Sequence, residues 1–380
     1  MEVKPPAAIS LGQFQQLIEA LVSRGFRVLG PVVRDGAIVY GDVGGIRDLP
    51  AGWTDRQERG EYRLERRPDN PLFGYAVGPQ SWKRFLHPPI EQLWRMRRNA
   101  DGTPTVQTEE KHEKFAFLGV RACELHGIAI QDRVFIDGLY PDVRYRRRRQ
   151  DAFIIAVNCG EPSGTCFCVS MGTGPKADSG FDLALTELLD GDSHLFIVET
   201  GSIAGSELLE QISHREASAE EVQAANAVVV QAAGRMGRRL DTDGLKEALQ
   251  GAPDHPRWDE VAGRCLGCAN CTMVCPTCFC TTVTDHSDLS GREAERVRRW
   301  DSCFNLDFSF IHGGAVRPNR RARYRQWMTH KLANWIDQFG TSGCVGCGRC
   351  ITWCPVGIDI TEEAAAIRAP ISGEGRHGGA

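Results

Sequence analysis

The sequence predicts an α+β or α/β N-terminal domain followed by a helical C-terminal domain built on two cysteine runs. Three observations predict this. Apolar strands and helices alternate from residue 115, Gly, Pro and Asp cluster at 251–256, and the density of cysteines rises beyond that point. We therefore expect domains at 1–253 and 254–370, with an insertion at 281–343 between the two runs and a flexible tail at 371–380.

The N-terminal elements follow from apolar periodicity. Ser10 can cap a helix whose apolar residues recur at helical spacing up to Val22, and Gly25 ends it. Short strands are predicted at 26–29 and 37–40, on either side of a turn. Residues 41–110 are rich in Gly, Pro and charge and give no clear pattern.

The middle of the chain predicts a partly parallel sheet. Buried strands are expected at 115–120, 152–157 and 194–199, with helices from Glu124 and around 183–189. Residues 203–250 look helical. The stretch VRYRRRRQ (143–150) carries five arginines and is typical of a solvated face, although a docking patch for an anionic partner is the alternative.

Two C-terminal helices are also expected. Apolar residues between 324 and 339 lie at helical spacing and mark a strongly amphipathic helix that stops at Gly340. Asp359 can cap a last helix.

Composition narrows the class of function. The net charge of −4 gives no footprint of nucleic-acid binding. No apolar run approaches the roughly 18 residues of a membrane span, and residues 1–10 lack the features of a signal peptide. We therefore expect a cytoplasmic protein with no nucleic-acid or membrane partner. Thiols stay reduced in that compartment, so the 15 cysteines indicate metal binding rather than disulfides.

One short motif occurs twice, and its spacing is that of a ferredoxin. In C-x2-C-x2-C-x3-C-P, three thiolates surround one iron–sulfur cluster, and the fourth cysteine ligates the other cluster. The first predicted 4Fe-4S cluster therefore takes Cys265, Cys268, Cys271 and Cys354, and the second takes Cys344, Cys347, Cys350 and Cys275. Gly267, Gly346 and Gly348 suit the tight loops. A pair of zinc sites is the alternative, but zinc favours two separated C-x2-C pairs.

Seven cysteines remain. Cys123 and Cys159 follow predicted strands, and Cys166 and Cys168 lie in a loop whose sequence TCFC returns at 277–280. Loops at the carboxyl ends of parallel strands share one edge of a sheet, so these four thiols can converge on a third cluster. Scattered structural thiols are the alternative. Cys278, Cys280 and Cys303 are either small buried hydrophobes or further metal ligands.

The motifs together resemble a known family. The segments RCLGCANCTMVCPTCFC (264–280), WDSCF (300–304), RYRQWMTHKLANWIDQFG (323–340) and GCVGCGRCITWCPVGIDI (343–360) are similar to the beta subunit of cytoplasmic NAD(P)-linked nickel–iron hydrogenases of the sulfhydrogenase type. The corresponding iron–sulfur subunit of anaerobic sulfite reductase is related and also similar. The resemblance extends over most of the chain, from about residue 10 to 365.

The resemblance implies a non-catalytic electron-transfer subunit. It would relay electrons between a nickel–iron catalytic subunit and a flavin subunit that binds NAD(P)H, with a small iron–sulfur subunit as a further partner. The sequence has neither nickel-ligand motifs nor a nucleotide fingerprint, so no catalytic residue is predicted. An electron-transfer role in a sulfite or polysulfide reductase is the alternative function, and a zinc-structured binding protein is the alternative of another class.

Overall fold

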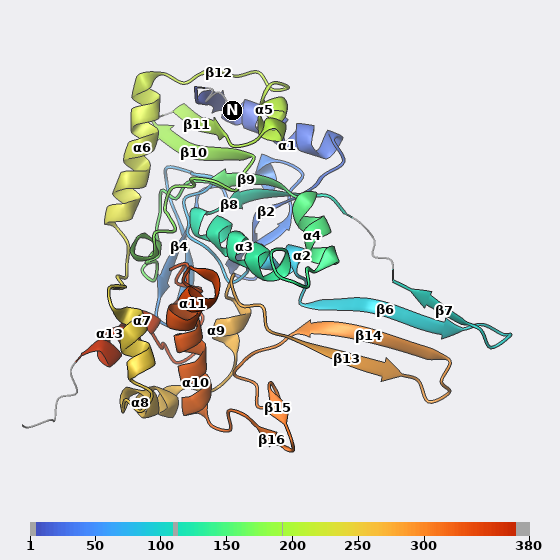
Figure 1. The fold of residues 1–380 in the computed structure, drawn as a ribbon. Coiled ribbons are helices and arrows are strands. Elements are labelled where there is room, and N and C mark those ends of the chain that lie inside the picture. The colour runs from blue at the N-terminus through green and yellow to red at the C-terminus, as the bar shows by residue number, and fades with distance from the viewer. Residues whose placement is uncertain (1–4, 109–112, 192, 370–380) are drawn as a thin grey trace, which may run out of the picture.

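The computed structural model describes residues 5–108, 113–191 and 193–369, arranged as in Figure 1. The largest sheet that these residues form has eight strands. In spatial order they are β12 (Arg215–Glu216), β1 (Ala7–Ser10), β11 (Ser193–Thr200), β10 (Leu183–Asp190), β9 (Phe153–Val157), β8 (Phe115–Val120), β2 (Arg27–Arg34) and β3 (Ala37–Asp42). The neighbours β2, β8, β9 and β10 pair in parallel, and the other pairs are antiparallel. The predicted fold class is confirmed; the predicted tail at 371–380 lies outside the described residues.

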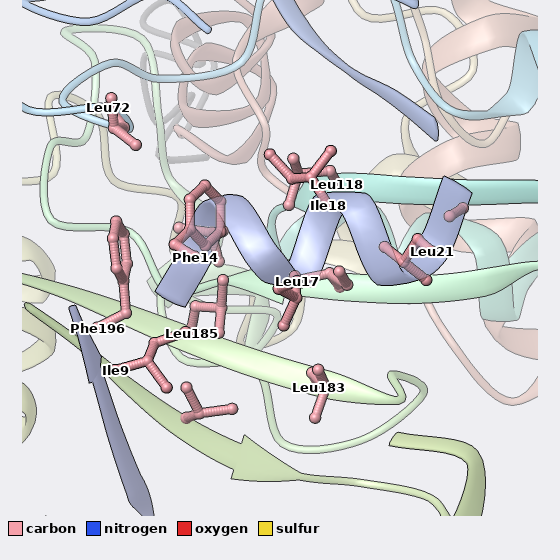
Figure 2. Packing of buried hydrophobic residues seen from close by; sticks show 14 of the residues in the cluster. Ile9, Phe14, Leu17, Ile18, Leu21, Leu72, Leu118, Leu183, Leu185 and Phe196 are labelled. Atoms are coloured by element: carbon pink, nitrogen blue, oxygen red, sulfur yellow. The ribbon is translucent and has the colours of Figure 1, made fainter. Parts of the chain in front are cut away.

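Helices cover both faces of this sheet because side chains alternate along its parallel strands. On β9, Ile155 faces the core under α1 (Leu11–Ser23) and α5 (Ile203–Leu209), whereas Ile154 faces the opposite core. That second face is covered by α2 (Lys83–Leu86), α3 (Ala122–Phe135) and α4 (Val143–Gln150). Figure 2 shows Phe14 and Leu17 of α1 packed over the first face. Ser10 caps α1, as predicted.

The predicted helix at 183–189 is wrong, because this segment is strand β10. Leu, Ala and Glu favour a helix locally, but Leu183 and Leu185 face one core and Ala184 faces the other, at strand spacing. β10 also pairs on both edges, with β9 and with β11. Tertiary pairing therefore outweighs helix propensity here.

The segment 203–250 is helical in three pieces. They are α5, α6 (Ala219–Gly234) and α7 (Leu245–Gly251), with β12 between the first two. The unpatterned segment 41–110 contains a short 3₁₀ turn, the hairpin β4 (Trp53–Glu58) and β5 (Glu61–Arg66), α2, and two strands of a second sheet.

The C-terminal part is mainly helical. Its elements are α8 (Arg257–Arg264), α9 (Asn270–Met273), α10 (Arg320–Thr329), the π-helix η3 (His330–Asn334), α11 (Trp335–Phe339), α12 (Arg349–Thr352) and α13 (Ile360–Arg368). The predicted amphipathic helix is the continuous run α10–η3–α11, and it ends at Gly340. Leu245 and Leu249 of α7 pack into the same core as Trp258 and Met328, so packing continues across residue 253. The division into 1–253 and 254–370 stays a prediction.

A four-stranded arm extends from the body in Figure 1. It consists of β13 (Thr281–Ser287), β14 (Glu293–Trp300), β6 (Ile90–Arg98) and β7 (Pro104–Gln107), and the short pair β15 (Phe310–Ile311) and β16 (Gly314–Ala315) follows it in sequence. Buried Glu91 of β6 pairs with Arg148 of α4 and Arg298 of β14. The side chain of Arg148 is only 6% exposed, so a fully solvated face at 143–150 is wrong.

Candidate metal centre

The two cysteine runs fold into similar loops. Gly267 has a φ of +68°, and its N–H donates to the sulfur of Cys265 at 3.4 Å. Gly346 has a φ of +64°, and its N–H donates to the sulfur of Cys344 at 3.5 Å. Residues with a side chain disfavour this left-handed region, so glycine lets the amide turn toward sulfur. Both loops therefore have the backbone conformation that the sequence predicts.

The first predicted ligand set lines one hollow, and Cys350 of the second set lines it as well. Phe304, Tyr324 and Trp327 also border it, so its wall is aromatic. Burial, together with the neighbouring Cys354 and Cys268 thiolates, raises the pKa of Cys265. The four thiols of the predicted set, beside an apolar space, fit a four-iron cluster, which needs four ligands and is sensitive to solvent exposure. The members of the set are Cys265, Cys268, Cys271 and Cys354.

The second predicted set also meets across the two runs. Burial, then the thiolates of Cys344, Cys347 and Cys275, raise the pKa of Cys350. Burial and the Cys275 thiolate also raise the pKa of Cys347, whereas Arg349 lowers it. The Nζ of Lys331 lies 3.0 Å from the Cys275 sulfur and donates to the Gly343 carbonyl at 3.4 Å, so Cys275 of the first run lies near the start of the second run. The assignment of ligands to clusters stays a prediction.

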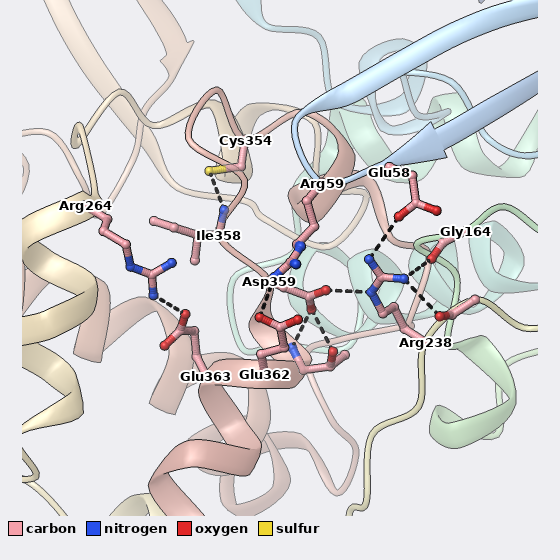
Figure 3. Close-up of polar contacts among 12 residues, drawn as sticks. Glu58, Arg59, Gly164, Arg238, Arg264, Cys354, Ile358, Asp359, Glu362 and Glu363 are labelled. Atoms are coloured by element: carbon pink, nitrogen blue, oxygen red, sulfur yellow. Dashed lines mark hydrogen bonds and ion pairs between the residues drawn. The ribbon is translucent and has the colours of Figure 1, made fainter.

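The fourth cysteine of the second run is held by residues from both parts of the chain (Figure 3). The N–H of Ile358 donates to the Cys354 sulfur at 3.3 Å. One residue further, Asp359 caps α13 and accepts a bond from Arg238 at 2.7 Å. Arg238 also contacts Glu58 of β4. The loop that carries Cys354 is therefore fixed against the N-terminal part of the molecule.

Two buried lysines lie beside the cysteines and were not predicted from the sequence. The Nζ of Lys331, in η3, lies 3.0 Å from the Cys275 sulfur and 3.0 Å from the hydroxyl of Thr277. The Nζ of Lys83 donates to the Cys278 carbonyl at 3.0 Å. The two residues are 5% and 4% exposed. A signal did exist for Lys331, because it lies on the apolar face of a predicted amphipathic helix.

The two lysines respond differently to their surroundings. Burial lowers the pKa of Lys83 to about 8. Burial also opposes the charge of Lys331, but the thiolates of Cys275, Cys278 and Cys344 outweigh it and raise the pKa of Lys331. A cation that donates to a ligand sulfur stabilises the reduced, more negative state of a cluster. Lys331 is therefore suited to tune the second predicted site.

Arg349, between two cysteines of the second run, joins that run to the N-terminal sheet. Its guanidinium donates to the carbonyls of Gly78 and Gln80, each at 2.8 Å, and pairs with the carboxylate of Glu124. Both charged side chains are buried, with exposures of 0% and 1%. Glu124 also accepts from the Trp82 indole. This pair links Cys123, the neighbour of Glu124, to the second run.

We expect Arg349→Met to destabilise the protein by about 3–5 kcal/mol, because it leaves the carboxylate of Glu124 buried without its cation. The measurement is denaturant-induced unfolding of the purified chain. Arg59→Met is the matched control, since Arg59 and Glu362 also join the two parts but are 46% and 49% exposed. That pair contributes about 0–1 kcal/mol. Equal losses in the two variants would contradict the structural role of Arg349.

The four N-terminal cysteines converge at the carboxyl ends of β8 and β9. A Cβ added to Gly174 would lie 3.3 Å from the Cys168 sulfur and 3.7 Å from the Cys123 nitrogen, so these two residues flank one glycine. The Cys159 N–H bonds to the carbonyl of Pro175 at 3.2 Å. Burial and the Cys159 thiolate raise the pKa of Cys166 to about 12. The structure brings together the four residues that the sequence predicted to meet.

Both TCFC segments contact the loop that carries the second cysteine run. In the first, the N–H of Phe167 bonds to the carbonyl of Gly346 at 2.8 Å. In the second, the hydroxyl of Thr277 donates to the carbonyl of Gly343 at 2.7 Å. Each copy is therefore held against the same loop by a hydrogen bond, although from a different position of the repeated sequence.

Cys278, Cys280 and Cys303 also lie near one another and near the predicted clusters. Burial, then the Cys280 thiolate, raise the pKa of Cys303 to about 12. Cys278 is hydrogen-bonded to Cys275, which lowers the pKa of Cys275 and raises that of Cys278.

Across the described ranges, no three Cys, His, Asp or Glu side chains are grouped as ligands of a single metal ion. Within those ranges, no helix is both long and apolar enough to cross a membrane.

Comparison with known proteins agrees with this arrangement. The profile of the 4Fe-4S dicluster domain family matches residues 264–358. Fold and site thus define an iron–sulfur electron-transfer protein. The chain is 36% identical over 345 residues to sulfhydrogenase 2 subunit beta of Pyrococcus furiosus, covering 90% of this chain and 92% of that protein. The chain belongs to the sulfhydrogenase beta subunit family. No solved structure matches it.

Proposed function

We propose that this chain is the relay subunit of a nickel–iron hydrogenase complex. It passes electrons between a nickel–iron catalytic subunit and a flavin subunit that exchanges hydride with NAD(P)H, with a small iron–sulfur subunit as a further partner. The family of the chain supports a role in a sulfhydrogenase. The many buried thiols support a reducing, cytoplasmic location.

The proposed relay has three sites. The first cluster is held by Cys265, Cys268, Cys271 and Cys354, and the second by Cys344, Cys347, Cys350 and Cys275. The third is held by Cys123, Cys159, Cys166 and Cys168. The first two belong to the proposed ferredoxin-like domain at 254–370, and the third belongs to the α/β domain at 1–253.

The observation that carries the proposal is the contiguity of these thiols. Cys350 of the second set lines the same hollow as the first set, which places the two sets side by side. Cys347 of the second set packs in the same buried cluster as Cys123 and Cys168 of the third set. Adjacent sites suit a relay, and the second set is then its middle member.

When bound, an iron–sulfur cluster supplies reversible one-electron transfer. The residues of the chain hold the clusters and set their surroundings. Tyr324 and Trp327 limit water at the first set. The Lys331 ammonium balances negative charge at the second, and Arg349 fixes the second set against the third.

The test is copurification from the native host, followed by hydrogen-dependent reduction of NAD(P). Tagged protein is expected to bring a nickel–iron subunit and a flavin subunit with it. Cys350→Ser is expected to copurify with the same partners yet lose more than about 90% of that activity, because it disrupts the middle site. Copurification with a sirohaem protein would instead indicate the sulfite reductase alternative.

A further inference from the structure

One end of the proposed relay opens onto the surface of the molecule. Cys268 of the first set is the single exposed cysteine among the fifteen, all of which lie in the described part of the chain. The members of the second and third sets are buried or partly buried. Because electron transfer slows steeply with distance, a partner protein can exchange electrons most directly with the first set.

Apolar side chains gather around this exposed thiol. Leu266 and Val356 are 58% and 38% exposed, and Pro355 is exposed as well. All three line the same hollow as Cys268, although they come from two different cysteine runs. Exposed apolar groups that are gathered in one place and bordered by polar residues mark sites of protein interaction. We call Leu266, Cys268, Pro355 and Val356 the docking surface.

Positive charge borders the docking surface. Arg320, the exposed first residue of α10, donates to the Cys265 carbonyl at 2.8 Å and therefore lies against the first cysteine run. The segment 317–325 holds five arginines and no acidic residue. Within the described ranges, only Arg321 of these five has a carboxylate within 4.0 Å. The uncompensated charge is complementary to an acidic protein face.

We infer that the docking surface receives a redox protein whose own cofactor is surrounded by acidic side chains. In each encounter one electron crosses between that cofactor and the first set, so that one is oxidised as the other is reduced, and no bond forms or breaks. Interfaces between electron-transfer proteins are small, so a few apolar side chains with a charged border are sufficient. This docking rests on the proposed relay role, but it does not depend on which catalytic subunit the complex contains.

The first test replaces Leu266 of the full chain with the photo-cross-linking residue p-benzoylphenylalanine in the native host. Irradiation is expected to join this position to a protein that carries a flavin, haem or iron–sulfur cofactor, through a segment rich in Asp and Glu. The matched control carries the same residue at Ile203, which is 68% exposed in α5, and should not give this product. No product at position 266, equal product at 203, or a partner without a redox cofactor would overturn the inference.

A charge-reversal variant tests the border of the docking surface. The cross-linked partner is purified, and its rate of association with the immobilised chain is measured at low salt. Arg320→Glu is expected to lower this rate about tenfold, because the new carboxylate repels an acidic face. Arg34→Glu is the matched control and should keep the rate, since Arg34 is exposed in β2 and also has no carboxylate within 4.0 Å among the described residues.

Iron analysis of each variant separates weaker docking from damage to the first set. If Arg320→Glu loses iron, Leu266→Asp takes its place, because it leaves the contact with the Cys265 carbonyl intact and also puts a carboxylate at the docking surface. An unchanged association rate in a variant that keeps its iron would overturn the inference.

Failure of the docking can be told from failure of the proposed function. A sirohaem protein joined to position 266 would support the docking and contradict the hydrogenase complex. Hydrogenase subunits that copurify with the chain but give no product at position 266 would do the reverse.

Discussion

Cys354→Ser is expected to abolish or alter the cluster held by Cys265, Cys268 and Cys271, and to leave the cluster of its own run intact. The reason is the position of Cys354, whose thiol borders the same hollow as the first run. Its thiolate also raises the pKa of Cys265. Serine is a poor ligand for iron in place of thiolate. The loss should reach about four irons per chain.

The measurement is low-temperature paramagnetic resonance of the dithionite-reduced protein, with iron analysis of the same sample. Cys275→Ser is the reciprocal variant and should damage the second cluster, because Lys331 contacts both the Cys275 sulfur and the Gly343 carbonyl at the start of the second run. If each serine instead altered the cluster of its own run, cross-ligation would be wrong and both runs would be self-contained.

The sequence predicted the elements whose patterns are local. The helix after Ser10, the strands at 115–120 and 152–157, and the helix ending at Gly340 all depend on periodicity or on a cap, and the structure contains them. β10 was mistaken for a helix because strand pairing on both of its edges comes from distant parts of the chain. The arm was missed for the same reason, since β6 and β14 lie about two hundred residues apart.

The cysteines of the site could be read from spacing, but their neighbours could not. C-x2-C-x2-C-x3-C-P places all of its cysteines within eleven residues and its proline at the twelfth, so the two runs stand out in any context. Lys83 and Arg349 look like ordinary surface residues in sequence, and only the fold buries them beside thiols and carboxylates. The second site therefore has a cationic environment that no local pattern indicates.

The last prediction concerns the N-terminal thiols. Cys166→Ser in the full-length chain is expected to remove about four irons, because the four thiols at the sheet edge form one group. Cys166 and Cys168 are themselves buried, although strand-end loops usually have exposed backbone and variable side chains. The full chain is required, because a fragment ending near residue 251 would expose Leu245 and Leu249, which pack into the C-terminal core.

Ser163→Ala is the matched control for this variant. Its hydroxyl lies 3.1 Å from the Cys166 sulfur and is buried in the same loop, but it supplies no thiolate. We expect Ser163→Ala to keep all of its iron and at most to shift the potential of the third cluster, because a hydrogen bond to a ligand sulfur stabilises the reduced state. Full iron content in Cys166→Ser would show that the N-terminal thiols are structural. The Cys347 thiolate also raises the pKa values of Cys123 and Cys166. If Cys166→Ser lost the second cluster instead of a third one, the four N-terminal thiols would be a support for Cys347 rather than a separate site.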